Sequence, residues 1–292
     1  MLNDADSAPE AHSPAMPTAL VGLLAGFASG FLGIGGGLVL VPLLSILLRC
    51  PIKRALGTSL TAILFIGLAG LAAEWEVSGD NTRWVWALFL SLGSVVGSAL
   101  GARLVLRIAD RPLRLALALV LIVASLGMAR LLPSGAELGT TLALVGGAPG
   151  QLVMVAVGVL AGLTSALFGL GGGIATVPAL ALFCSDLPFG AIRATSLAAV
   201  VMAATLDARQ HARLGHVDPG LVRLLLPGGL AGAVLGVIAA NGLPVALCRT
   251  VLAALLVLIA LRLMLPAWQK STTLSGWAGR TRGQAGQLRR QP

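Results

Sequence analysis

The sequence predicts an all-α polytopic membrane protein built from two copies of one four-segment unit. Its 292 residues are 57% hydrophobic and only 11% charged, with a mean hydropathy of +0.95. Apolar stretches of helix length recur along the chain, and a glycine-rich pattern in the first half returns in the second. A soluble chain of this length needs about 25% charged residues to cover its surface. We therefore expect lipid to be its solvent.

Eight apolar segments set the organisation of the chain. Six of them have about 19–23 residues, the length of one helix across the hydrocarbon core. The eight segments span about 17–48, 55–73, 84–106, 112–132, 150–183, 189–207, 221–240 and 243–265. We expect a polar N-terminal tail over 1–16, a first transmembrane repeat over 17–132, a linker over 133–149, a second repeat over 150–265 and a basic C-terminal tail over 266–292.

The first and fifth segments are too long for one ordinary crossing. Each exceeds 30 residues, roughly 45–50 Å if helical throughout. Each also carries three consecutive glycines near its middle, and each glycine weakens a helix interior by about 1 kcal/mol. The pattern predicts a broken helix in both segments. Pro42 and Pro178 are expected at the start of the second half-helix, where a missing N–H costs nothing.

An internal repeat supports the two-unit organisation. Glycine, serine and proline positions of the first segment recur 136 residues later: Gly22, Gly26, Ser29, Gly33, Gly35, Gly36, Gly37 and Pro42 match Gly158, Gly162, Ser165, Gly169, Gly171, Gly172, Gly173 and Pro178. Thr58-Ser59 then matches Thr195-Ser196, and Gly93, Gly97 and Gly101 match Gly228, Gly232 and Gly236. Three blocks in the same order are not explained by chance similarity between glycine-rich sequences. We interpret the second glycine series as a close-packing surface of helices.

The doubled motif resembles the sulfite exporter TauE/SafE family of membrane permeases. It reads Gly26-Phe-Ala-Ser29-Gly30-Phe-Leu-Gly33-Ile-Gly35-Gly36-Gly37-x4-Pro42, and returns as Gly162-Leu-Thr-Ser165-Ala166-Leu-Phe-Gly169-Leu-Gly171-Gly172-Gly173-x4-Pro178. The resemblance covers about residues 17–265, and Ala166 departs from the first copy, which has Gly30. It implies transport of sulfite, sulfonates or related small anions.

The distribution of positive charge indicates the orientation. If each glycine-broken segment dips into the membrane and returns to its own side, 16 of the 20 Lys and Arg residues lie on one side. The positive-inside rule makes that side cytoplasmic. Each unit then crosses three times, so the two repeats are inverted, as in many secondary transporters. We expect both termini to be cytoplasmic and the protein to be a multi-pass protein of the cell inner membrane.

A broken helix also predicts where an anion binds. Its free backbone N–H groups, at the positive end of a half-helix, favour a negative ligand in a low dielectric. Close packing without a ligand is the alternative interpretation. Small hydroxyl side chains nearby can add neutral donors, and Arg193 is a candidate for attracting an anion, with a snorkelling interfacial side chain as the alternative. The candidate binding residues are Ser29, Gly35, Gly36, Gly37, Thr58, Ser59, Ser165, Gly171, Gly172, Gly173, Thr195, Ser196 and Arg193.

The remaining ionisable residues favour no catalytic centre. Glu74 and Glu76 are expected at the outer membrane boundary, and Asp207 with Arg209 and His211 is expected to form an interfacial cluster. The three cysteines, Cys50, Cys184 and Cys248, are far apart and form no metal or redox motif. We therefore expect no catalytic residue, no metal site and no cofactor.

The function favoured by these patterns is secondary transport of small anions, rather than enzymatic activity. An anion channel with the same glycine-lined site is the alternative, followed by a membrane-embedded enzyme or redox protein. The expected partners are a small anionic solute and the lipid bilayer, and assembly into a homo-oligomer is left open. The net charge of +9 lies mainly in loops and the tail, which favours membrane topology and not nucleic-acid binding.

Overall fold

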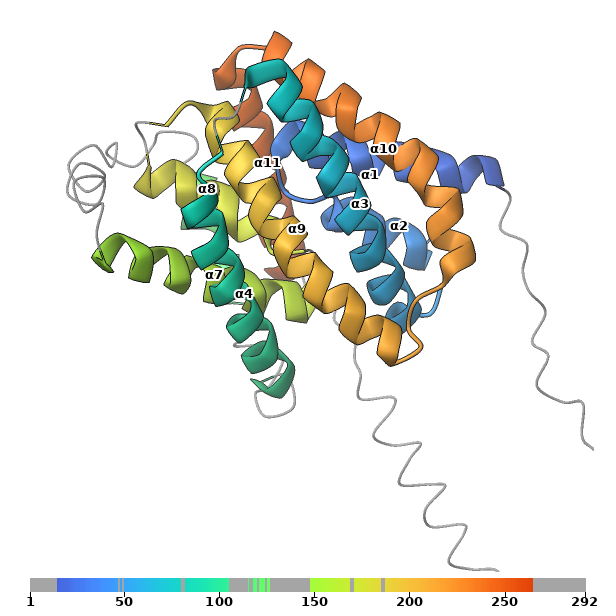
Figure 1. Cartoon of the computed structure of the whole chain (residues 1–292). Coiled ribbons are helices and arrows are strands. Elements are labelled where there is room, and N and C mark those ends of the chain that lie inside the picture. The colour runs from blue at the N-terminus through green and yellow to red at the C-terminus, as the bar shows by residue number, and fades with distance from the viewer. Residues whose placement is uncertain are drawn as a thin grey trace, which may run out of the picture.

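The computed structural model describes residues 15–46, 48, 50–79, 82–104, 115, 118–119, 121–123, 125–126, 148–168, 171–184 and 187–264. These residues form helices and short connections, without a strand among them, so the all-α prediction is confirmed (Figure 1). The helices are α1 (Ala15–Leu32), α2 (Gly37–Ile46), α3 (Ile52–Ser78), α4 (Trp84–Leu104), α7 (Ala148–Phe168), α8 (Gly173–Phe183), α9 (Phe189–Arg213), α10 (Pro219–Gly242) and α11 (Val245–Met264).

Both long apolar segments are broken at their glycine clusters, as the sequence predicted. Helix α1 ends at Leu32 and α2 begins at Gly37, while α7 ends at Phe168 and α8 begins at Gly173. Glycines in both connections have positive φ angles, a region that glycine adopts without a steric penalty. The φ values are +75° at Gly33, +83° at Gly35, +69° at Gly36, +72° at Gly171 and +75° at Gly172. We call residues 33–36 the first break and Gly171–Gly172, directly before α8, the second break.

The expected position of the two prolines is wrong. Pro42 and Pro178 lie inside α2 and α8, in the second turn, and do not begin these helices. The glycines begin them instead: Leu40 N–H donates to Gly36 O (3.0 Å), and Ala175 N–H donates to Gly172 O (3.2 Å). The left-handed glycines Gly36 and Gly172 cap these helices six residues before the prolines, so each proline only removes one hydrogen bond from the second turn.

The ordinary apolar segments also form helices. Three helical stretches among the described residues are long and apolar enough to cross a membrane: Arg54–Ser78, Phe189–Arg213 and Pro219–Gly242. Shorter apolar helices account for the segments predicted from residues 84 and 243. The segment predicted over 112–132 lies mostly outside the described residues.

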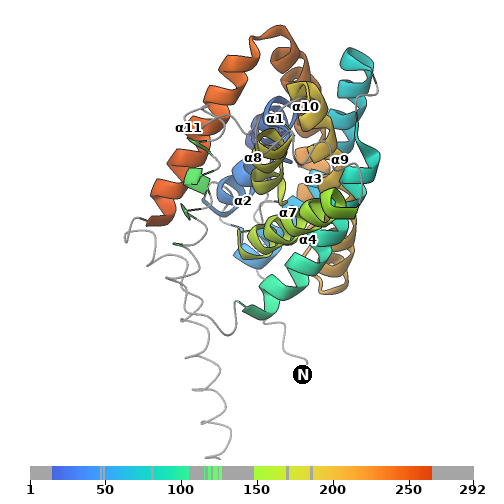
Figure 2. The same cartoon turned by 90° about the vertical axis from the view of Figure 1, so that its left-hand side faces the viewer.

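Helices of the first half of the chain pack against helices of the second half. Helix α1 packs along α10, and α7 packs along α4, so each broken segment rests on a helix of the other half (Figures 1 and 2). Glycines make this approach possible, because a Cβ at Gly26 would overlap the carbonyl oxygen of Gly229, and a Cβ at Gly162 would overlap that of Ser94. Glycines of the partner helices make the reciprocal contacts at Gly97, Gly232 and Gly236. The predicted packing role of that series is confirmed at these three positions.

The contacts also give the relative directions of the helices. Along α1 and α10, Gly22 meets Leu225 and Gly30 meets Ala233, so these two helices are parallel. Helix α3 is parallel to α10, since Ile66 contacts Gly229 and Gly70 contacts Ala233. Helices α4 and α7 are parallel to each other by the same test, with Leu90 against Gly158 and Ser94 against Gly162. Helices α3 and α9 are antiparallel, because Gly70 contacts Leu197 whereas Glu74, one turn later, contacts Arg193.

Each broken segment leaves the bundle at the end where it entered. Gly22 near the start of α1 packs beside the start of α10. After α1 and α2, the chain reaches Thr58, whose Oγ1 accepts a hydrogen bond from the Asp218 N–H (3.1 Å), directly before α10. In the second half, Thr195 Oγ1 accepts from the Arg83 N–H (3.1 Å), directly before α4, with which α7 runs in parallel. The two segments therefore form helical hairpins within the bundle.

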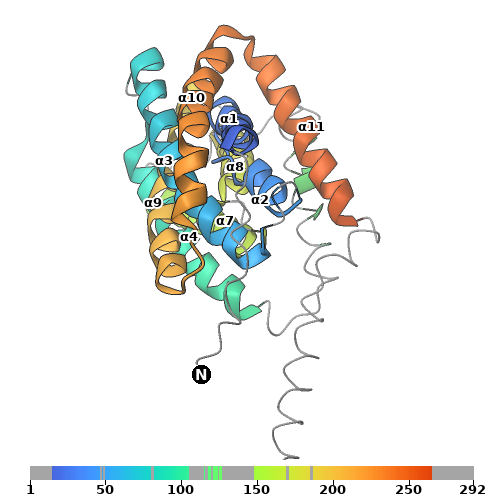
Figure 3. The ribbon, with the colours of Figure 1, turned by 90° about the vertical axis from the view of Figure 1, so that its right-hand side faces the viewer.

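The buried core lies between these hairpins and the antiparallel helices α3 and α9. Helix α11 continues from α10 and leans away from it along one side of the bundle (Figure 3). Many large apolar side chains remain on the outside, among them Leu20, Leu24 and Phe27 of α1. An exposed apolar surface of this extent is typical of a protein embedded in lipid.

Candidate functional site

The two breaks meet at the centre of the molecule. A Cβ at Gly173 would overlap the carbonyl oxygen of Ile34, so the second half-helix of one hairpin begins against the break of the other. Gly35 and Gly171 both face Ile63 and Val200, at 2.7–3.8 Å from the position of an added Cβ. The glycines predicted as binding residues in the two repeats are therefore brought together.

Ile63 and Val200 occupy the space between the breaks. They hold equivalent positions in the two repeats, on the antiparallel pair α3 and α9. Ile63 is fully buried, Val200 is 2% exposed, and both pack with Ala204 in a small apolar cluster. The centre of the site is thus closed by two apolar side chains.

The half-helices α2 and α8 begin at this centre. The N-cap of α8 is Gly172, in the left-handed conformation, with no hydrogen bond from a capping side chain. Backbone hydrogen bonds to Gly36 O and Gly172 O start at Val39 and Ala175. The N–H groups at the start of a helix have no partner within the helix, and they carry its positive dipole end. Two such ends lie at the point where the hairpins meet.

Two of the predicted hydroxyl side chains, Ser29 and Ser196, lie at the first break. Ser29 is fully buried, and its Cβ lies 3.3 Å from a Cβ built on Gly36. The hydroxyls of Ser29 and Ser59 are buried without a hydrogen-bond partner. Ser196 Oγ donates to Gly33 O (2.9 Å) and so ties α9 to the first break. A buried polar atom without a partner costs free energy, so an unpartnered hydroxyl here is unusual.

The other predicted hydroxyls have structural roles or no described contact. Thr58 and Thr195 accept the backbone hydrogen bonds from Asp218 and Arg83, at opposite ends of the bundle. Thr195 also donates to Ala191 O (2.7 Å). Ser165 is buried, at 5% exposure. The sequence pattern correctly placed all of these residues inside the bundle, but it did not separate the structural pair from the serines near the breaks.

A small pocket adjoins the second break. Gly171 and Gly172 line it together with Thr176, Ser94 and Val200. Thr176 Oγ1 donates to Gly172 O (2.9 Å), so its oxygen can still accept a hydrogen bond. No charged side chain lines this pocket. Its polar groups are therefore hydroxyls and backbone amides.

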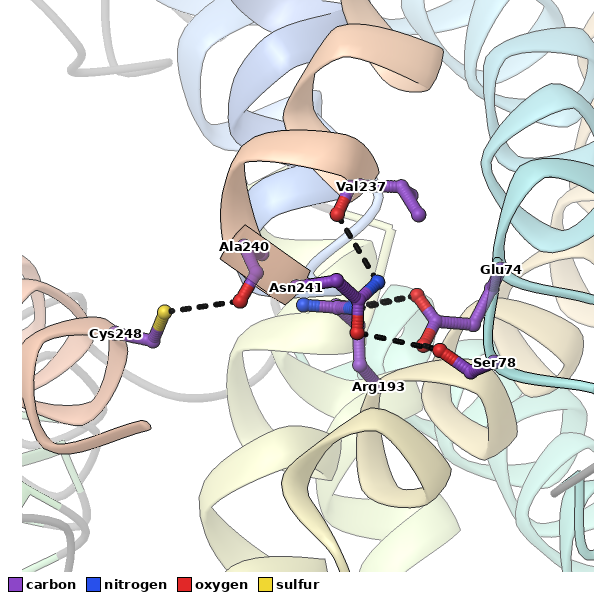
Figure 4. A network of polar contacts seen from close by, with 7 residues as sticks. All are labelled: Glu74, Ser78, Arg193, Val237, Ala240, Asn241 and Cys248. Atoms are coloured by element: carbon purple, nitrogen blue, oxygen red, sulfur yellow. Dashed lines mark hydrogen bonds and ion pairs between the residues drawn. The ribbon is translucent and has the colours of Figure 1, made fainter. Parts of the chain in front are cut away.

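Arg193 lies beside the first break and is deeply buried. A Cβ at Gly33 would come within 2.7 Å of Arg193 Cγ. The guanidinium forms an ion pair with Glu74 on α3, in which Arg193 Nε donates to Glu74 Oε2 (2.9 Å) and Nη2 donates to the same oxygen (Figure 4). Both side chains are 1% exposed. Arg193 is therefore not an exposed, snorkelling side chain, and Glu74 is buried in the protein near the end of α3.

The second oxygen of Glu74 belongs to a small polar network. Ser78 Oγ lies 3.0 Å from Glu74 Oε1 and 3.2 Å from Asn241 Oδ1, so its one hydrogen can serve either acceptor. Asn241 Nδ2 donates to Val237 O (3.1 Å), and Cys248 of α11 lies on the far side of α10, where its thiol approaches Ala240 O at 3.7 Å (Figure 4). The network joins α3, α9 and α10 at one end of the bundle.

Glu74 is a site residue that the sequence interpretation missed. The sequence interpretation placed it at the membrane boundary because Trp75 lies between Glu74 and Glu76, and in the structure Trp75 and Glu76 are exposed. The signal that could have identified it is the internal sequence repeat. Once the Thr58 and Thr195 regions are aligned, α3 and α9 are equivalent, and an antiparallel pair brings the end of one to the start of the other.

The expected cluster of Asp207, Arg209 and His211 is not found. Asp207 Oδ1 accepts a hydrogen bond from Ser98 of α4, at 3.4 Å. The His211 ring lies against that of His216, with centroids 5.6 Å apart. Arg209 is exposed. Arg209 lies two residues after Asp207 and so points to a different face of α9, whereas Asp207 and His211 share a face but have different partners, Ser98 and His216.

Comparisons with known proteins identify the family. A family model described as sulfite exporter TauE/SafE matches residues 2–128 and 154–290. A probable membrane transporter protein of Xylella fastidiosa strain 9a5c is 30% identical over 225 residues, which cover 75% of this chain and 82% of that protein. The probable membrane transporter protein YunE of Bacillus subtilis is 29% identical over 235 residues, covering 74% and 85% of the two chains.

A third relative, the probable membrane transporter protein MJ0441 of Methanocaldococcus jannaschii, is 32% identical over 119 residues, 38% of this chain and 44% of its own. No solved structure matches this chain. The family consists of membrane transporters and not of enzymes, and the apolar helices described above fit that class. This chain is a member of the sulfite exporter TauE/SafE family of membrane transporters.

Proposed function

We propose that this protein is a secondary transporter of small anions, and that the anion binds where the two glycine breaks meet. Sulfite and sulfonates are the preferred substrates, because the matching family is described as a sulfite exporter family. The glycines and Ser29 provide neutral donors, and Arg193 lies at the edge of the same site. Neutral donors suit transport, since a bound ion must also be released.

The meeting of the two hairpin breaks carries this proposal. Two helix N-termini converge on one buried point, and the hydroxyl of Ser29, beside the first break, lacks a hydrogen-bond partner. A helix N-terminus attracts an anion through its free N–H groups and its dipole. A bound oxyanion would accept hydrogen bonds from these amides and this hydroxyl, and would so remove the cost of leaving them unsatisfied.

The helix directions support an inverted-repeat transporter. Helix α1 is parallel to α10 and α3, α7 is parallel to α4, and α3 is antiparallel to its repeat equivalent α9. Arg83 and Arg193 lie at one end of the bundle, whereas Arg54, Arg209, Arg213 and Arg223 lie towards the other, beside Asp218. By the positive-inside rule, the second end faces the cytoplasm of a cell inner membrane, and so do both chain termini.

The closed centre favours a carrier over an anion channel. Ile63 and Val200 fill the space between the breaks, so an ion crosses this point only if the helices carrying them move. Alternating access around a fixed midplane site is the usual behaviour of inverted-repeat carriers. Counterflow of labelled sulfite in proteoliposomes tests this preference, since a carrier exchanges internal for external anion and a channel does not.

The breaks themselves are tested by substitution. In Gly36→Leu and Gly172→Leu, a side chain must adopt a positive φ and also contact backbone of the preceding half-helix, at Ala25 O or Ala161 O. We expect both variants to lose at least nine-tenths of sulfite or sulfoacetate uptake while they still insert into the membrane. Gly215→Leu is the matched control, because Gly215 has a φ of +69° but nothing within 4 Å of an added Cβ.

Normal uptake by both break variants would remove the breaks from the mechanism. Equal loss in the Gly215 variant would mean that a strained backbone alone impairs the protein. A wild-type protein that moves neither sulfite, sulfoacetate nor acetate in proteoliposomes would contradict the proposed substrate class.

A further inference from the structure

We propose that Glu74 is an internal competitor of the transported anion: in this structure it holds the guanidinium that the anion takes over when it binds. The proposal rests on the proposed function and deepens it, because it assigns a second role at the same site. It concerns the one ion pair described inside the bundle, between Arg193 and Glu74.

Arg193 is placed to serve a ligand at the breaks. Among the described residues, it is the one charged side chain in contact with a break glycine, through its Cγ and Gly33. Ser196, one turn further along α9, donates to the carbonyl of the same glycine (2.9 Å). An anion held by neutral amides and hydroxyls in a low dielectric gains most from a nearby positive charge. Arg193 supplies that charge within the buried site.

The guanidinium does not stay unpaired in this structure. Its Nε and Nη2 both bind Oε2 of Glu74, instead of each binding one carboxylate oxygen. The two parallel hydrogen bonds of a forked arginine–carboxylate pair are therefore not formed, and these give the pair its greatest strength and specificity. An oxyanion with two or three oxygens can make both bonds, so it can compete with Glu74 for Arg193.

Glu74 has a place to go when it leaves Arg193. Its second oxygen is already bonded to Ser78, in the last turn of α3. Trp75, Glu76 and Val77 in the same turn are exposed, so the end of α3 is accessible from outside the bundle. A rotation of the side chain towards that end hydrates the carboxylate while Arg193 keeps a negative partner. Exchange of one anion for another avoids a buried unpaired charge.

The other half of the molecule argues against a purely structural role. Extending the alignment of Thr58 with Thr195 pairs Arg193 with Leu56, and Glu74 with His211. The same two helices therefore pack at their other end without an ion pair between these positions. Buried ion pairs generally contribute little to stability compared with apolar residues of similar size. The Arg193–Glu74 pair is present at the end of α3 and α9 where Arg193 lies next to Gly33 of the first break.

Competition predicts opposite effects of the two substitutions. In Glu74→Gln the amide still accepts and donates hydrogen bonds, but the negative competitor is gone, so KM for anion uptake should fall at least threefold. In Arg193→Gln the positive charge is gone, and uptake should fall at least tenfold. Glu76→Gln is the matched control, because Glu76 is exposed in the same turn and has no described contact with Arg193.

The experiment measures uptake of radiolabelled sulfite and sulfoacetate by the full chain in proteoliposomes, using whichever anion the wild type transports. A charge-swapped variant, Glu74→Arg with Arg193→Glu, separates competition from structural pairing. Competition predicts no recovery of uptake, because the positive charge has moved away from Gly33. Thermal unfolding in detergent reports whether the swapped protein is folded.

Two results would overturn the proposal. One is recovery of wild-type uptake in the charge-swapped protein, which would make the pair a structural link. The other is a KM of the Glu74→Gln variant equal to that of the Glu76→Gln control, and this arm remains decisive if the swapped protein does not fold. A wild type that transports neither anion contradicts the proposed function, and this failure is recognised in the wild-type measurement itself, before any variant is compared. In that case, anion-dependent thermal stabilisation of wild type and Arg193→Lys tests the competition directly.

Discussion

At one end of the α3–α9 pair, Arg193 and Glu74 form a buried ion pair, whereas at the other end the equivalent positions hold Leu56 and His211. The contacts around these ends are otherwise closely matched. Thr195 accepts a backbone hydrogen bond from Arg83 at the first end, and Thr58 accepts the equivalent bond from Asp218 at the second, both at 3.1 Å. The two halves thus share their framework and differ in charge.

This difference indicates which features belong to the fold and which belong to function. Features that occur twice, such as the glycine contacts and the threonine hydrogen bonds, are needed to assemble the bundle. Features that occur once are not required by the packing of α3 against α9. A transporter that moves a charged solute in one direction has a use for such an asymmetry between its two faces.

Filling the glycine contacts should have the largest effect, and it should be the same in both halves. In Gly26→Val and Gly162→Val, the new side chains meet backbone carbonyls of Gly229 and Ser94, which cannot rotate away. We expect each variant to lose at least about 3 kcal/mol of stability and most of its monodisperse yield in detergent. Gly242→Val is the control, because nothing lies within 4 Å of its added Cβ.

A large loss in only one half would show that the two hairpins are not equivalent. In that case the packing of α1 on α10 and the packing of α7 on α4 would contribute unequally to stability, and the two halves would not share one framework.

Removing one member of the ion pair should lower stability much more than removing both members. Arg193→Leu or Glu74→Leu alone leaves a buried charge without its partner, at a cost of about 3–5 kcal/mol. The double variant makes this end apolar, as at Leu56, and should recover most of that loss. Chemical unfolding of the three variants in detergent measures the difference. If the double variant is as unstable as the worse single one, the pair is part of the framework.

The two threonine hydrogen bonds should contribute equally. Thr58→Val and Thr195→Val each remove the acceptor for one backbone N–H, which costs about 1 kcal/mol. Thermal unfolding of both variants compares the two ends directly. Hydrogen exchange should become faster at the Asp218 amide in the first variant and at the Arg83 amide in the second. A threefold difference between the two losses would contradict the matched framework.

The smallest effect is expected at a second asymmetric contact. Ser98 donates to Asp207 at 3.4 Å, whereas the equivalent residues of the other half are Ala233 and Gly70, which pack together. This bond is long, and an alanine already fits at the equivalent position, so Ser98→Ala should change stability by less than about 0.5 kcal/mol. A larger loss in thermal unfolding would assign Asp207 a structural role.

Much of the fold could be predicted because glycine leaves a strong pattern in an apolar sequence. Three consecutive glycines inside a segment longer than the membrane predicted both breaks, at residues 33–36 and 171–172. The second glycine series correctly predicted close packing. Sequence could not say that Gly232 packs on α1, because glycine spacing defines a helix face and not the helix that covers it.

The charged part of the site was harder to predict for a physical reason. Arg193 and Glu74 are 119 residues apart and belong to different repeats. Each was interpreted from its neighbours, and exposed Trp75 and Glu76 indicated a boundary position for Glu74. Burial of a charge depends on a partner that local sequence does not reveal. Pro42 and Pro178 were misplaced although their neighbours are informative. The glycines that precede them in the sequence already begin both helices.

The crossed arrangement of the hairpins also constrains how the protein is made. The contact between Gly26 and Gly229 joins residues about 200 positions apart in the chain, so α1 leaves the ribosome long before the helix that covers it. At typical synthesis rates of about 5–20 residues per second, that delay is about 10–40 s. Throughout it, the glycine-lined face of α1 has no permanent neighbour. The hairpin of α1 and α2 therefore remains without its α10 neighbour until Pro219–Gly242 has been translated, which makes its closest helix contact one of the last to form.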